Sequence, residues 1–128
     1  MTPARLAAAL RNHAQGLYCL EAAAELLIAQ SWLHRADFTS QFVTFEHGLP
    51  GSQPIAIVDW PAAITALDAG DLPCSGGERR MLRLTASLDD GIPVDLQEAL
   101  TGIDNHNVQL LVRTVHHASG QWPAPLNP

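Results

Sequence analysis

The chain contains no lysine, and its seven basic residues are all arginines. Thirteen aspartates and glutamates give a formal net charge of −6, which repels the phosphate backbone of a nucleic acid at long range. Nucleic acid is therefore disfavoured as the default partner. The absence of lysine, together with the abundance of alanine, indicates a GC-rich coding genome rather than a functional demand.

Cysteines are few and long apolar runs are missing. Cys19 and Cys74 form no CxxC pair, and Cys19 lies in an apolar helical run where a small buried thiol is expected. No unbroken run of ~18 apolar residues could span a bilayer, and the first residues lack the apolar core and cleavage site of a signal peptide. These absences predict a cytoplasmic protein with no membrane partner and no functional disulfide.

Several catalytic and metal-binding motifs are also missing. No GxSxG elbow occurs, and the glycine-containing segment Ser75–Arg79 is too short for a phosphate-binding loop and lacks its lysine. His106, His116 and His117 on the last expected helix are not spaced i, i+4, which excludes an HExxH-like zinc site. We expect these histidines to complement the helix dipole, and we expect no catalytic residue, no metal ligand and no cofactor.

Small aliphatic residues must build most of the core, because 47% of the residues are hydrophobic but only 5% are aromatic. Such a composition favours helices. The 128 residues match one domain that buries roughly two thirds of its unfolded surface. We expect a single globular domain over residues 1–120 and an extended or disordered tail over residues 121–128, in which Trp122 is the only anchor.

Capping signals divide the chain into about six helices. Ser75 followed by Glu78 is a capping box that predicts a helix from about Gly76, ended by Gly91. Similar signals predict helices over residues 2–12, 17–35, 59–70 and 105–118, and a further one that opens at Asp95.

The longest expected helix, Leu17–Arg35, is apolar on most of its circumference. Such a helix belongs in the middle of a fold or partly in an oligomer interface. After it, Gln41–Glu46 and Ile55–Val58 are β-rich runs around a loop dense in glycine and proline, which predicts a hairpin. Two strands alone are marginal in water, so the hairpin must lie on the helices or pair with that of a second copy.

The last expected helix, Asn105–Ala118, carries an apolar stripe spaced i, i+3, i+4, i+7. Its members are Val108, Leu111, Val112 and Val115. This pattern predicts that the stripe faces the core.

Two carboxylates, Glu21 and Glu25, lie one turn apart on the longest expected helix and need partners. Arg79, Arg80 and Arg83 are the candidates, because their charges oppose the dipole of their own helix unless something neutralises them. We expect these acids and arginines to pair. The same five residues form the candidate site if the chain binds a small molecule or an anion.

Three segments of the sequence, which together cover most of the chain, resemble a group of known proteins. They are EAAAELLIAQSWLHRADF, VDWPAAITALDAGDLPCSGGERRMLRLTASL and GIPVDLQEALTGIDNHNVQLLVRTVHHASG. Together they look like a group of small, mostly helical proteins from high-GC Gram-positive bacteria. The resemblance implies a cytoplasmic bacterial protein and assigns no activity to any residue.

These features together predict an α+β fold, mostly α, with about six helices around a central apolar helix and one β-hairpin. They favour a non-enzymatic protein-interaction or regulatory module that is a homodimer with an unidentified protein partner. The alternative is a small-molecule or anion-binding protein, with or without enzymatic activity, that uses the arginines at 79–83. DNA binding through the helix-turn-helix-like segment Leu84–Leu100 ranks third. The second helix of that segment carries Asp95 and Glu98 but no lysine or arginine, so it would present carboxylates to the phosphates.

Overall fold

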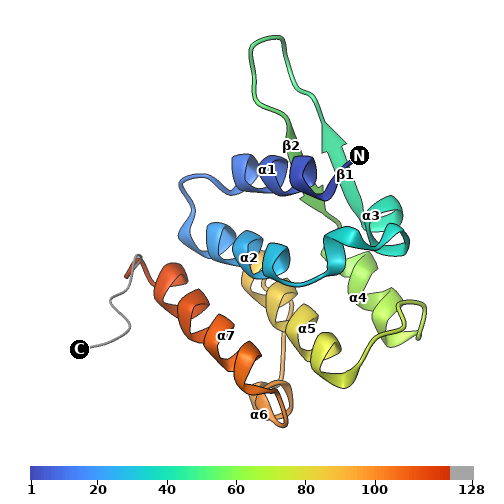
Figure 1. Ribbon diagram of the computed structural model, residues 1–128, viewed down its shortest axis with the longest axis vertical. Coiled ribbons are helices and arrows are strands. Elements are labelled where there is room, and N and C mark those ends of the chain that lie inside the picture. Colours follow the sequence, from blue (N-terminus) through green and yellow to red (C-terminus); the bar gives the residue numbers. More distant parts are fainter. Residues whose placement is uncertain (122–128) are drawn as a thin grey trace.

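The computed structural model describes residues 1–121, which form seven α-helices, one 3-10 turn and a two-stranded hairpin (Figure 1). In chain order they are α1 (Pro3–Ala14), α2 (Tyr18–Ala29), η1 (Trp32–His34), α3 (Ala36–Phe42), β1 (Val43–Glu46), β2 (Ile55–Val58), α4 (Trp60–Asp68), α5 (Gly76–Asp90), α6 (Leu96–Leu100) and α7 (Asn105–Ala118). The expected α+β, mostly α class is confirmed. Apart from Gln121, the tail predicted around Trp122 lies outside the described residues.

Side-chain caps begin the helices where the sequence predicts them. At α5 the hydroxyl oxygen of Ser75 accepts from the Glu78 N–H (3.1 Å), and the Glu78 carboxylate accepts from the Ser75 N–H (2.9 Å). Gly91 ends this helix with a left-handed φ of 70°, which glycine adopts without strain. Four other helices have a capping side chain, on Thr2, Asp59, Asp95 and Asp104.

The single helix predicted over Leu17–Arg35 is too long, because α2 ends at Ala29. The Gln30 side-chain amide donates to a backbone carbonyl one turn earlier (2.9 Å) and to the hydroxyl of buried Thr85 (3.1 Å). The second of these bonds ties the end of α2 to α5. The chain then turns through η1 and buries Trp32 against Phe38, with 5.4 Å between the ring centroids.

The first predicted strand is also too long, because Gln41 and Phe42 belong to α3, a helix that the sequence analysis did not predict. Phe38 and Phe42 are one turn apart and both buried, so helical spacing places them in the core together. The shorter strand pairs antiparallel with β2, from Val43 opposite Val58 to Glu46 opposite Ile55. Of the two alternatives for the hairpin, packing on the helices is observed, because β2 lies against α1.

The apolar interior consists of a large cluster and a small one. The large cluster joins α1–α5, η1 and the hairpin, whereas the small one consists of Leu26, Met81 and Leu110, where α2, α5 and α7 meet. α7 packs mainly on α2, and α6 packs on α5, at the end of the molecule opposite the hairpin loop (Figure 1). Among residues 1–121, no helix is both long enough and apolar enough to cross a membrane.

A buried indole depends on one carboxylate that the sequence analysis did not single out. The Trp60 indole N–H donates to Asp89 at 2.5 Å, and the Trp60 side chain is only 2% exposed. Burial raises the pKa of Asp89 above its ordinary value, partly offset by the Trp60 hydrogen bond. Because the folded pKa is raised, the contribution of Asp89 to stability is complete below its unfolded pKa and declines as the pH rises through the folded value.

The substitution Asp89→Asn removes the charge but keeps an acceptor for the indole. We expect its free energy of unfolding at pH 7, from urea denaturation, to equal or exceed that of the wild type. Asp89→Ala should lower that free energy by about 1–3 kcal/mol, because the buried N–H loses its partner. Equal losses in both variants would contradict this account.

Candidate functional site

Glu25 of α2 pairs with Arg11 of α1. The guanidinium donates from Nε to Oε2 at 2.7 Å and from Nη2 to Oε1 at 3.0 Å, so both carboxylate oxygens are engaged. This hydrogen bonding raises the pKa of Arg11 above its ordinary value. Both side chains are exposed, and a pair of this kind adds about 1 kcal/mol or less to stability.

Glu21 joins three segments of the chain. Its Oε1 lies 3.0 Å from Nε2 of His117 on α7, and its Oε2 accepts from the Gly16 N–H at 2.8 Å. An ionised carboxylate can only accept, so Nε2 of His117 carries the proton. The hydrogen bonds from His117 and then from Gly16 lower the pKa of Glu21. The α1–α2 turn, α2 and the end of α7 therefore meet at this carboxylate.

The expected pairing of the two acids with the arginines of α5 is wrong. Arg83 pairs with Asp68, and Nε of Arg80 donates to the Glu98 carbonyl at 3.2 Å. Arg79 forms no ion pair within residues 1–121.

The acids instead find closer partners on α1 and α7. The five predicted site residues are therefore divided between two separate groups, the acids on α2 and the arginines on α5. His116 and His117 lie in the last turn of α7, as the dipole interpretation expects, and His117 is in addition bonded to Glu21.

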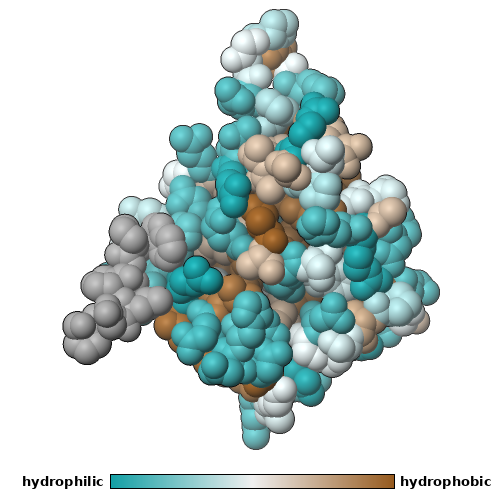
Figure 2. Space-filling view, viewed as in Figure 1, coloured by the Kyte–Doolittle hydropathy of each residue, from teal (hydrophilic) through white to brown (hydrophobic). Residues whose placement is uncertain are grey.

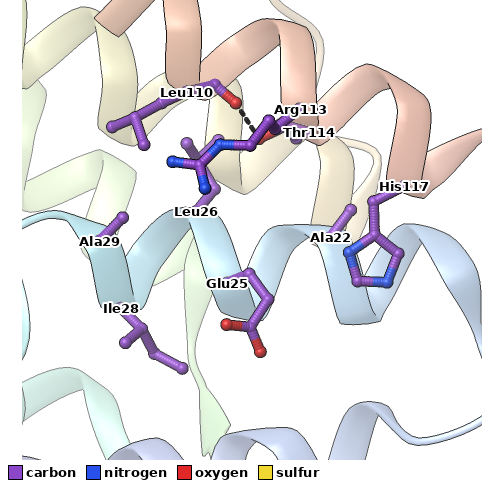
Figure 3. Close-up of a pocket in the computed structure, with 9 residues that line it drawn as sticks. All are labelled: Ala22, Glu25, Leu26, Ile28, Ala29, Leu110, Arg113, Thr114 and His117. Atoms are coloured by element: carbon purple, nitrogen blue, oxygen red, sulfur yellow. Dashed lines mark hydrogen bonds between the residues drawn. The ribbon is translucent and has the colours of Figure 1, made fainter. Parts of the chain in front are cut away.

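A pocket of about 450 Å³ lies between α2 and α7 (Figure 3). Its apolar wall consists of Ala22, Leu26, Ile28, Ala29 and Leu110. The three chargeable residues that line it are Glu25, Arg113 and His117.

Of these three side chains, only Arg113 is without a partner within the described part of the chain. Glu25 and His117 are held by Arg11 and Glu21, whereas the Arg113 side chain makes no hydrogen bond or ion pair with residues 1–121. In Figure 3 the Arg113 side chain extends from α7 towards the pocket, and the Glu25 carboxylate points away from it. The pocket therefore presents one free guanidinium beside an apolar wall.

The prediction that the valine stripe of α7 faces the core is wrong for its three valines. Val108, Val112 and Val115 are 38%, 40% and 65% exposed, and Leu111 is half-buried. The α2-facing side consists of Leu110, Thr114 and His117, spaced i, i+4, i+7, with Leu110 and His117 buried. The side that faces α2 contains polar Thr114 and His117, so a search for apolar periodicity did not identify it as the contact face.

An apolar groove of about 460 Å³ borders this exposed stripe. Leu84 and Leu88 of α5, Val94, and Leu96 of α6 line it together with Leu111 and Val115. We define the α6–α7 face as the exposed apolar residues Leu96, Leu100, Val108, Val112 and Val115. Figure 2 shows hydrophobic colour around the margins of α7, with hydrophilic residues in front of it. Two helices therefore expose apolar side chains at one end of the molecule.

Both cysteines are free thiols in the structure. Cys19 is exposed, so the expected buried thiol is wrong. Its Sγ lies 3.9 Å from the Ala118 carbonyl oxygen near the end of α7. Cys74 is partly buried, and this burial raises the pKa of its thiol.

Arg11 and Arg113 are the site residues that the sequence analysis missed, and His117 was considered there only for zinc and for the helix dipole. The spacing of Leu110, Thr114 and His117 was one available signal, but Arg11 lies in an ordinary amphipathic helix and has none. Residues 1–121 contain no group of three or more His, Cys, Asp or Glu side chains that could hold a metal ion. No protein-family model, curated protein or solved structure matches the chain.

The lowered pKa of Glu21 predicts a pH dependence. The stability that it contributes is complete above its unfolded pKa and is lost as the pH falls through the lower folded value. We expect Glu21→Gln to have a lower melting temperature than the wild type near pH 7 and a smaller decline on acidification. The control Glu46→Gln, on β1 and away from α7, should keep the wild-type decline. Parallel pH profiles for wild type and Glu21→Gln would contradict this role of Glu21.

Proposed function

We propose that this protein is a non-enzymatic interaction module whose two copies associate through the α6–α7 face. The observation that carries this proposal is the exposure of Val108, Val112 and Val115 on a helix whose opposite side is packed on α2. Contiguous apolar surface on a small protein marks interaction sites. A second copy buries that surface without requiring any other molecule.

The spacing of the stripe suits a second copy related by a two-fold axis. Val108, Leu111, Val112 and Val115 are symmetric about the midpoint between Leu111 and Val112. In an antiparallel pair of α7 helices, Val108 lies opposite the partner's Val115, and Leu111 lies opposite the partner's Val112. Self-complementarity of this kind is what an isologous dimer interface needs.

The charges of α7 also favour self-association. The chain carries a net charge of −6, but no aspartate or glutamate occurs between Asn105 and Ala118. Two acidic copies repel each other least where they present no carboxylates. The valines thus lie on a helix that brings no acidic side chains into the contact.

Two further contacts weaken the DNA-binding alternative. Arg80 and Arg83 are engaged with Glu98 and Asp68, so they are less available to phosphates.

We also propose that the protein acts in the cytoplasm, since a reducing compartment suits its free thiols.

Sedimentation equilibrium of the wild type and of Val112→Glu tests the proposed dimer. We expect the wild type to be a dimer at micromolar concentration. In Val112→Glu, two carboxylates near the symmetry axis should weaken association by about tenfold or more. Leu49→Glu, at an apolar residue of the hairpin loop that is more exposed than Val112, is the control for a new surface carboxylate and should remain a dimer.

Circular dichroism would verify that both variants fold. A monomeric wild type, or a Val112→Glu variant that dimerises as well as the wild type, would overturn the proposed interface. Loss of association in Leu49→Glu alone would place the contact on the hairpin instead.

A further inference from the structure

We infer that the pocket between α2 and α7 binds a small monocarboxylate with an apolar body, and that Arg113 holds its carboxylate. This site goes beyond the proposed dimer, because it lies on the side of α7 opposite to the valine stripe. Its volume of about 450 Å³ falls within the range of roughly 300–1,000 Å³ that is usual for small-molecule sites.

The expected charge of the ligand follows from which of the chargeable lining residues already have a partner. Both oxygens of Glu25 are bonded to Arg11, so this carboxylate has little capacity left for a cationic ligand. His117 is hydrogen-bonded to Glu21. Arg113 remains as the cation without a partner in residues 1–121, which selects an anion.

The number of charges favours a monoanion. One guanidinium can hold a carboxylate with two parallel N–H···O bonds. The second negative charge of a phosphate dianion would find no further unpaired cation among the lining residues within residues 1–121. The pocket therefore fits a carboxylate better than a phosphate.

The rest of the lining selects an apolar body. Leu26 and Leu110 lie beside Arg113, and Ile28 is a further aliphatic residue of the lining. Ala22 and Ala29 leave the space open because their side chains are short. The one hydroxyl in the lining, on Thr114, already donates to the Leu110 carbonyl at 2.7 Å. An alkyl or similar group can occupy this wall without desolvating an unpaired polar group.

Hexanoate is a suitable probe, and hexanol and hexylammonium are neutral and cationic comparison ligands of equal chain length. We expect hexanoate to shift the amide NMR signals of α2 and α7 with a Kd on the order of 1 mM. Hexanol should bind more weakly, and hexylammonium should not bind. Equal affinity for hexanol, or no shifts at hexanoate concentrations well above that Kd, would overturn the assignment.

Charge-changing variants locate the binding site. Arg113→Gln should weaken hexanoate binding by about fivefold, the effect of one exposed ion pair, whereas Arg113→Lys should weaken it less, because the ammonium keeps the charge but cannot form the two parallel bonds. Arg79→Gln is the matched control, because Arg79 is also unpaired within residues 1–121 but does not line the pocket. Unchanged binding in Arg113→Gln would refute the site, and loss in Arg79→Gln would move it to α5. Sedimentation of the same samples separates this outcome from a failure of the proposed dimer.

Discussion

The rotational setting of α7 on α2 is the constraint on which the surface of this protein depends. Leu110 is buried between α2 and α5, and seven residues later His117 is fixed by Glu21. These two contacts hold one side of α7 inward. Successive residues of a helix are about 100° apart, so a rotation of α7 by somewhat more than one residue step would turn the valine stripe inward. The same docking therefore places Arg113 at the α2 pocket and directs the valine stripe towards solvent.

The sequence predicted those features of the fold that arise from neighbouring residues. The capping box at Ser75 and Glu78 and the left-handed Gly91 act within a single helix, so the bounds of α5 could be predicted. The end of α2 could not, because Gln30 ends that helix partly by bonding to Thr85, 55 positions later. α3 was missed because its burial depends on a cluster in which Phe38 contacts Trp32 and Trp60.

The candidate site was predictable only in part, for the same reason. Glu21 and Glu25 were singled out as acids on a largely apolar helix, and each of them has a partner in the structure. Their partners could not be identified, because His117 is 96 positions from Glu21 and nothing local indicates their contact. The face of α7 was misassigned because four aliphatic residues outweighed a contact face that contains a threonine and a histidine. The valine stripe that was predicted to face the core is the surface now proposed to bind a second copy.

Oxidative cross-linking tests the setting of α7 most directly, in a background where Cys19 and Cys74 are replaced by serine. A cysteine at Val112 would lie near the two-fold axis of the proposed dimer, which would bring two copies within disulfide range, whereas a cysteine at Leu110 faces α2. The account predicts that Val112→Cys forms a covalent dimer under mild oxidation and that Leu110→Cys does not. Cross-linking of Leu110→Cys with Val112→Cys unreactive would mean that α7 docks with the opposite face, and it would contradict the account.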